Sequence, residues 1–179
     1  MKKYTIIGLI LIALAVGSLF VVNYYQNQQR LEKIYSQIET TSEYESLSKE
    51  LESWCDRFYF SKPRLHLRLN HSLEGYYSQG ILTLLTPLEV FLTDKEVLRG
   101  IMAHEFGHYY LSIRHPELDP KAQELFADIV AKDMVGIDLV KKTLSKGINR
   151  QEDSVHLPYE SRLIFLEKYK DKKIIEDRN

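Results

Sequence analysis

The segment Gly100–Tyr110, GIMAHEFGHYY, places polar side chains at a fixed spacing within an otherwise apolar stretch. It contains two histidines, His104 and His108, four residues apart, and Glu105 directly follows the first of them. Residues at this spacing lie on the same face of an α-helix, one turn from each other. The segment therefore predicts an apolar helix that presents two imidazole rings toward one point.

This helix is expected to begin at a capping box formed by Thr93 and Glu96 and to end before Pro116. After a short loop, Asp119 as N-cap and Pro120 at the first helical position predict a second helix, which continues to residue 134. Because only a loop separates the two helices, the second can fold back against the first.

The second helix offers two acids, Glu124 and Asp128, which again lie four residues apart. A catalytic metal site needs three protein ligands and leaves one position for water. We therefore predict that Glu124 is the third ligand and that Asp128 accepts the free ring N–H of a ligating histidine, His104. The apolar neighbours on this helix argue against an ordinary solvated acidic face, because buried unpaired carboxylates are unfavourable. Glu117 and Asp119 are weaker alternatives because they lie in the loop.

This set of side chains is typical of a catalytic zinc site. Zinc lowers the pKa of a bound water toward neutrality, and a carboxylate at position 105 can accept the proton so that hydroxide attacks a carbonyl. We expect one zinc ion per chain, bound by His104, His108 and Glu124, with Glu105 as the general base. The competing interpretation is coincidence, in which each histidine is satisfied by an unrelated hydrogen bond. The pattern does not separate zinc from other divalent metals.

Short strands are predicted before the histidine helix. Residues 64–70, RLHLRLN, alternate apolar and polar side chains, and residues 74–87 contain two short apolar runs around Gln79 and Gly80. These runs predict a small antiparallel sheet.

Further helices flank these strands. Ser42 and Glu45 form a capping box for a helix that continues to Phe58, and helices are expected between Gly136 and Gly147 and near the C-terminus. The expected fold class is therefore α+β and mostly helical.

The first 25 residues predict an N-terminal transmembrane helix. Two lysines precede an uncharged apolar run, Ile6–Val22, and Tyr24 and Tyr25 follow it as an interfacial pair would. A cleaved signal peptide is the alternative, because Ala13–Ala15 resembles a cleavage site, but the apolar run continues beyond it. The expected location is a single-pass membrane protein with its catalytic domain outside the cytoplasm.

The remaining chain is divided into residues 26–58 as juxtamembrane helices, 59–170 as the catalytic domain and 171–179 as a charged tail. The chain has a formal net charge of −1 over 179 residues. It therefore lacks the excess of basic residues that nucleic-acid binding requires. The single cysteine, Cys55, excludes an intramolecular disulfide and a cysteine-based zinc site.

The block Gly80–Tyr110, followed by ELFAD at residues 124–128, resembles the HtpX-like and CAAX-prenyl-protease-like zinc metallopeptidases of the gluzincin clan. In that family, an apolar strand precedes a helix of the pattern L-[ST]-D-x-E-L-x-x-[VI]-[LM]-A-H-E-x-G-H, and the third ligand comes from E-x-E-A-D. Phe126 replaces the middle glutamate of this second pattern, which touches no metal ligand. The resemblance covers roughly residues 60–170 and implies a zincin-type fold and a zinc cofactor.

The resemblance also implies a role for the region before the C-terminal helix. The family carries a later His-Pro pair and an arginine there, and this chain has HLPYESR with His156, Arg162 and the proline shifted by one position. In such enzymes a residue of this region helps to bind substrate or the tetrahedral oxyanion. His156 is expected to do so here, with Tyr159 as the alternative. A surface histidine before a helix is the competing interpretation.

These observations predict a membrane-anchored zinc-dependent metalloendopeptidase that hydrolyses peptide bonds through a metal-activated water, with a protein or peptide as its substrate. The strands near residues 75–86 would offer an edge to which an extended peptide can add. The alternative is a catalytically inactive, membrane-tethered metal-binding or regulatory protein on the same fold. Glu105 argues against this alternative, because a structural metal site gains nothing from a base. The sequence predicts neither cleavage preference nor oligomeric state.

Overall fold

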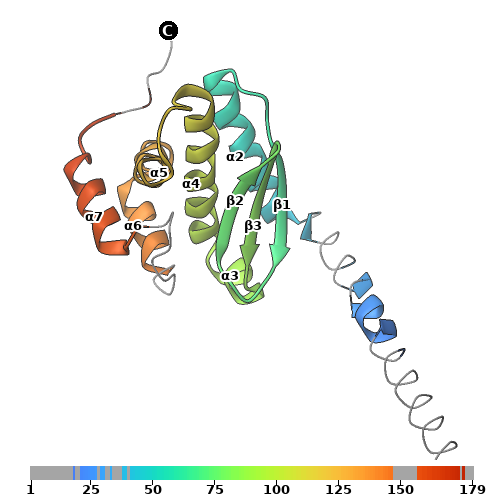
Figure 1. Ribbon diagram of the computed structural model, residues 1–179. Helices are drawn as coiled ribbons and strands as arrows, with labels where there is room; N and C mark the ends of the chain where they lie inside the picture. The colour runs from blue at the N-terminus through green and yellow to red at the C-terminus, as the bar shows by residue number, and fades with distance from the viewer. Residues whose placement is uncertain are drawn as a thin grey trace, which may run out of the picture. The chain divides into compact units, whose positions relative to one another are not determined.

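The computed structural model describes residues 18, 21–27, 29–30, 33, 38–39, 41–146, 157–173 and 175. The chain divides into two units, residues 1–40 and residues 41–179, and the second contains the elements that form the site. In chain order these are α2 (Ser42–Phe58), β1 (Arg64–Leu69), β2 (Glu74–Ser78), β3 (Ile81–Thr86), α3 (Leu88–Thr93), α4 (Lys95–Arg114), α5 (Pro120–Val135), α6 (Ile137–Lys146) and α7 (Tyr159–Lys168) (Figure 1).

The three strands form a mixed sheet in the order β1-β3-β2. The predicted hairpin is present: β2 pairs antiparallel with β3, and the turn between them places Gln79 and Gly80 at positive φ, 50° and 78°. β1, however, pairs parallel with β3. The expectation of a purely antiparallel sheet is therefore wrong. The chain reverses direction after β1 and again after β2, so β3 runs in the same direction as β1 and lies between the other two strands.

The core lies where α4 packs between the sheet, α2 and α5 (Figure 1). On one side of α4, the ring of Phe106 lies 5.6 Å from that of Trp54 and 6.1 Å from that of Phe58, both on α2. Buried leucines of β1 and β3 add to this core; they are Leu65, Leu67, Leu82 and Leu84. Apolar contacts thus hold α4 on several sides, and they fix the direction of its histidine-bearing face.

The opposite side of α4 packs closely against α5. A Cβ atom at Gly107 would lie 2.7 Å from the carbonyl oxygen and 2.8 Å from the Cα of Ala127, so the two backbones are close to contact here. The start of α5 is as predicted: Asp119 accepts hydrogen bonds from two amides of the first turn, and Pro120 is the first helical residue.

Two predicted helix starts are wrong. Thr41, not Ser42, caps α2, because the Thr41 hydroxyl accepts a hydrogen bond from an amide of the first turn. The Thr93–Glu96 capping box does not form, because Thr93 ends the short helix α3 and its hydroxyl donates to the carbonyl of Glu89. The histidine helix α4 therefore begins at Lys95.

The predicted membrane anchor is also corrected. Within the part of the chain that the structure describes, no helix has both the length and the apolar character that crossing a bilayer requires. A span needs about 20 predominantly apolar residues, whereas the described helical residues 21–27 include Asn23, Gln26 and Asn27. Most of the predicted anchor, residues 1–17 and 19–20, lies outside the described residues. The transmembrane part of the fold class and the single-pass, extracytoplasmic location are therefore not retained.

Candidate metal centre

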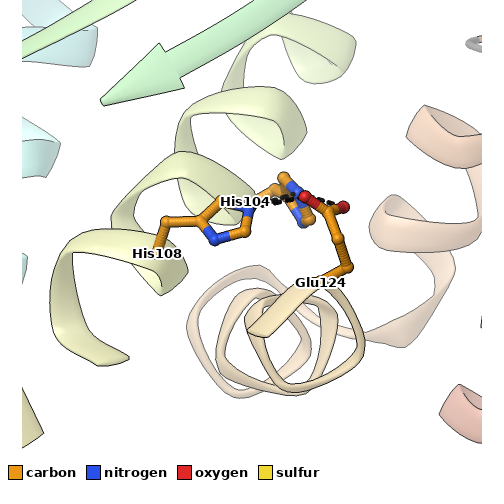
Figure 2. A group of neighbouring side chains, drawn as sticks. All are labelled: His104, His108 and Glu124. Atoms are coloured by element: carbon orange, nitrogen blue, oxygen red, sulfur yellow. Dashed lines mark hydrogen bonds and ion pairs between the residues drawn. The ribbon is translucent and has the colours of Figure 1, made fainter. Parts of the chain in front are cut away.

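The face of α4 that meets α5 carries His104 and His108, and Glu124 reaches them from the second turn of α5 (Figure 2). His104 Nε2 lies 3.1 Å from His108 Nε2 and 3.4 Å from Glu124 Oε2, and His108 Nε2 lies 3.1 Å from Glu124 Oε1. Their ligand atoms all lie within 4.8 Å of one another, so this group could hold a metal ion.

The orientation of His104 fits such an ion. Its Nδ1 lies 2.9 Å from Asp128 Oδ1. Asp128 is on the same face of α5 as Glu124, one turn further along the helix. With Nδ1–H donating to this carboxylate, Nε2 of the neutral ring carries a lone pair directed at the other two ligands. The sequence-predicted pairing of Asp128 with His104 is thus present in the structure.

Arg162 on α7 completes the arrangement. Its Nε donates to Asp128 Oδ2 and its Nη2 to Asp128 Oδ1, both at 2.7 Å, which is a bidentate pair between two buried side chains. Its Nη1 also lies 3.6 Å from Glu124 Oε2. One guanidinium therefore holds Asp128 in place and offsets the charge of both carboxylates of α5.

These contacts set the protonation of the site in the absence of a cation. Burial by itself raises the pKa of Asp128, but Arg162 and His104 outweigh it and lower the value. Burial also raises the pKa of Glu124, but the contacts with His104 and His108 outweigh it and lower that value as well. Burial by itself lowers the pKa of His104, but the charge and hydrogen bond of Asp128 and the contact with Glu124 raise it to about 9. The carboxylates are thus ionised near neutral pH, and a metal ion would take the place of a proton on His104.

Glu105 follows His104 on α4 and extends toward β2. It is 5% exposed, and a Cβ atom at Gly75 would lie 2.5 Å from its Cγ and 2.7 Å from its Oε1. The absence of a side chain at Gly75 therefore lets the edge strand approach the carboxylate. Glu105 and His104 both line one cleft of about 280 Å³, so the acid and one of the three candidate ligands face a shared space.

The other residues singled out by the sequence lie elsewhere. Asp119 caps α5, and Glu117 contacts His115 in the exposed loop, so neither joins the group. His156 lies outside the described residues, and Tyr159, its alternative, lines the cleft. No role was predicted for Arg162, although it matches an arginine of the family that the chain resembles. That arginine in HLPYESR was the signal available in the sequence.

A scan against protein-family models finds no match for this chain, and searches of curated proteins and of solved structures return none. Inferences about function therefore rest on the side chains of the site and their geometry.

Proposed function

We propose that this protein is a zinc-dependent metallopeptidase in which His104, His108 and Glu124 bind the ion and Glu105 is the general base. The observation that carries this proposal is the convergence of three ligand atoms from two helices, one of which, on His104, belongs to a residue that lines the same cleft as the buried Glu105. The resemblance of these segments to the HtpX-like zinc metallopeptidases supports the same reading.

The chemistry and spacing of the ligands favour zinc. Two imidazole nitrogens and one carboxylate oxygen are a common catalytic zinc set, whereas calcium and magnesium prefer oxygen ligands alone. Ligands about 2.0–2.1 Å from a tetrahedral zinc ion lie about 3.3 Å from one another. The three separations in this group are 3.1, 3.1 and 3.4 Å, which is close to that value.

The residues divide the catalytic work between them. A bound zinc ion would polarise the substrate carbonyl and make a water molecule more acidic. Glu105 accepts the proton of the attacking water and delivers it to the leaving nitrogen, since the same carboxyl group is an acid once it is protonated. Asp128 keeps the ring of His104 in one orientation and one tautomer, and Arg162 keeps Asp128 ionised.

The sheet offers a place for an extended peptide. β2 forms one edge of the sheet, pairs only with β3 in the described residues, and passes Glu105 at Gly75. A peptide that adds to this edge by backbone hydrogen bonds would place its own carbonyl groups near Glu105. Peptide bonds are therefore the substrate class that the site suits best.

The first test replaces the base. Glu105→Gln keeps the shape of the side chain but cannot accept a proton, so we expect unchanged zinc content and a loss of peptide hydrolysis of about 10²–10⁴-fold. Glu117→Gln, the same change at an exposed position outside the site, should keep full activity. Undiminished turnover by Glu105→Gln would contradict the assignment.

The second test removes ligands. His108→Ala and Glu124→Ala each leave two protein ligands, so we expect both variants to be purified without stoichiometric zinc, as measured by elemental analysis. His115→Ala, which removes an exposed imidazole outside the group, should keep one zinc per chain. A full zinc complement in His108→Ala would contradict the ligand set. If the wild type binds zinc but cleaves no member of a broad peptide library, the protein is a metal-binding protein without peptidase activity.

A further inference from the structure

The cleft beside His104 and Glu105 extends well past these two residues. It has a volume of about 280 Å³ and lies between the edge strand β2, α4, α6 and the start of α7. Much of its wall is apolar, formed by Leu73, Ile101, Val140, Leu144, Leu157 and Pro158. Concave, mostly apolar spaces with a few placed polar groups are typical of ligand pockets.

We propose that this cleft binds one side chain of the substrate next to the scissile peptide bond and selects a large apolar residue of the size of leucine, methionine or phenylalanine. This inference rests on the proposed peptidase function and adds a specificity to it. Apart from His104, Glu105, Asp128 and Arg162, the residues that line the cleft have no part in the metal centre.

The dimensions of the cleft support this size class. An apolar cavity of about 150 Å³ in another protein is large enough to hold a benzene ring. A space of about 280 Å³ thus accommodates a phenyl ring or a branched aliphatic chain. An alanine side chain would leave most of it unfilled and would lose most of the apolar contact with its wall.

The position of β2 explains how a side chain would reach the cleft. Glu74 and Gly75 line the cleft and form the start of this edge strand, and Leu73, which also lines the cleft, directly precedes it. In an extended peptide paired with such an edge, side chains point alternately to the two faces. A residue near the carbonyl that faces Glu105 would therefore point toward the cleft between α4 and α6.

The charges near the cleft do not favour a basic side chain. Asp128 lines the cleft, but its two oxygens are taken by Arg162 in a bidentate pair, which leaves no free negative charge in that part of the wall. Glu160 is exposed and Glu74 half-buried, so both are accessible to water at the rim. Glu105 is the other buried acid of the wall, and it lines the cleft beside His104, where the proposed chemistry takes place. Away from these residues, the wall is formed mainly by apolar side chains.

The width of the cleft is set by a close helix contact. A Cβ atom at Gly100 would lie 1.9 Å from Thr143 Oγ1, so the side chain of Thr143 on α6 packs directly against the backbone of α4 at this point. Leu144 follows on α6 and contributes to the wall. Because this contact fixes α6, a change in the size of residue 144 should change the space for substrate rather than be absorbed by a shift of the helix.

The test uses the full-length, zinc-loaded protein and peptides of one scaffold in which only the residues beside the scissile bond are varied. We expect kcat/KM for phenylalanine or leucine at one of these positions to exceed that for alanine or lysine by roughly 10–200-fold. Leu144→Trp, which fills the cleft, should remove this preference while zinc content stays the same. Ser145→Trp, the same bulk at the next, exposed position of α6, should keep it.

A second variant guards against a folding defect. Leu144→Ala enlarges the cleft and should shift the preference toward tryptophan. Equal cleavage of all peptides by the wild type, a preference for lysine, or an equal loss for every peptide in both Leu144 variants would overturn the inference.

A binding measurement separates this inference from the peptidase proposal. In zinc-loaded Glu105→Gln, the fluorescence anisotropy of labelled peptides reports binding without cleavage. Tighter binding of the phenylalanine peptide than of the alanine peptide, abolished by an added Leu144→Trp, supports the pocket even if the wild type cleaves nothing. Equal binding of both peptides overturns it even if the wild type is a peptidase.

Discussion

Among single side chains, Arg162 contacts both acids that α5 brings to the site. It is buried on α7 and pairs with Asp128 through two hydrogen bonds, while its third nitrogen approaches Glu124. Burial by itself lowers the pKa of Arg162, but the charges of Asp128, Glu124 and Glu105 outweigh it and raise the value. Burying several carboxylates together is unfavourable unless a cation offsets their charge, and Arg162 supplies that cation from a separate helix.

Replacement of Arg162 should therefore affect both stability and metal binding. Arg162→Ala leaves Asp128 buried without its counter-charge, so we expect the free energy of unfolding to fall by about 3–5 kcal/mol and zinc affinity to fall by about 10–100-fold. Urea unfolding and zinc titration measure these two changes.

The matched variants for this prediction are Arg162→Lys and Arg99→Ala. Arg162→Lys restores the charge without the bidentate geometry and should recover part of both losses. Arg99 forms a partly exposed pair with Glu50, so Arg99→Ala should lower the free energy of unfolding by no more than about 1 kcal/mol. Arg162→Ala with wild-type zinc affinity would show that Asp128 orients His104 without help.

Local spacing explains which residues of the site the sequence could predict. His104 with His108 and Glu124 with Asp128 are pairs four residues apart on one helix, and such pairs can be read without knowledge of the fold. The contact of Arg162 with Asp128 joins positions 34 residues apart on different helices. No spacing rule predicts such a contact, so the role of this arginine became apparent only from the packing of α7.

Among the helices and strands, the contact between α4 and α5 places the ligands. Gly107 lies directly over the backbone of Ala127, one turn from Glu124. The sequence predicted both helices and their antiparallel return. It did not predict the mixed sheet, because the alternation of apolar and polar residues in β1 is the same whether a strand pairs parallel or antiparallel.

Gly107→Ala tests this helix contact. In an exposed helix, alanine stabilises relative to glycine by about 1 kcal/mol. Here the added methyl group would meet backbone atoms that cannot rotate away, so we expect a destabilisation of about 1–3 kcal/mol together with weaker zinc binding as α5 shifts. Thermal unfolding with and without zinc measures both. Ser112→Ala, at an exposed position of α4, should stay within about 0.5 kcal/mol of the wild type. A stabilised Gly107→Ala variant would rule out a tight contact.

For the whole molecule, composition and pattern predicted an α+β chain with most of its helices and strands in place. Besides the direction of β1 and two helix starts, the membrane anchor is the part that is corrected. The apolar run Ile6–Val22 has 17 residues, which is at the short end of the length that a transmembrane helix requires. The described helical residues that follow it carry amide side chains, which do not lengthen an apolar span.

A bound ion should stabilise the whole domain, because it links α4 to α5. At a free zinc concentration 100 times the dissociation constant, we expect the free energy of unfolding to rise by about 2.7 kcal/mol, which corresponds to roughly 5–10 °C in Tm for a chain of this size. Calorimetry with zinc and then with excess chelator measures the shift. His108→Ala should show no zinc-dependent change, and an unchanged wild-type Tm would contradict a metal ion held between the two helices.

The contribution of α7 to the site has a consequence for the timing of activity. Residues 104–108, 124–128 and 162 come from α4, α5 and α7, and the guanidinium that balances the two acids is the last of these to leave the ribosome. A newly made copy therefore lacks the complete charge balance of the site until that arginine has docked. Under the proposed function, unfinished chains would be unable to cut the other polypeptides around them, and the competence to cleave would arise only with the completed native state.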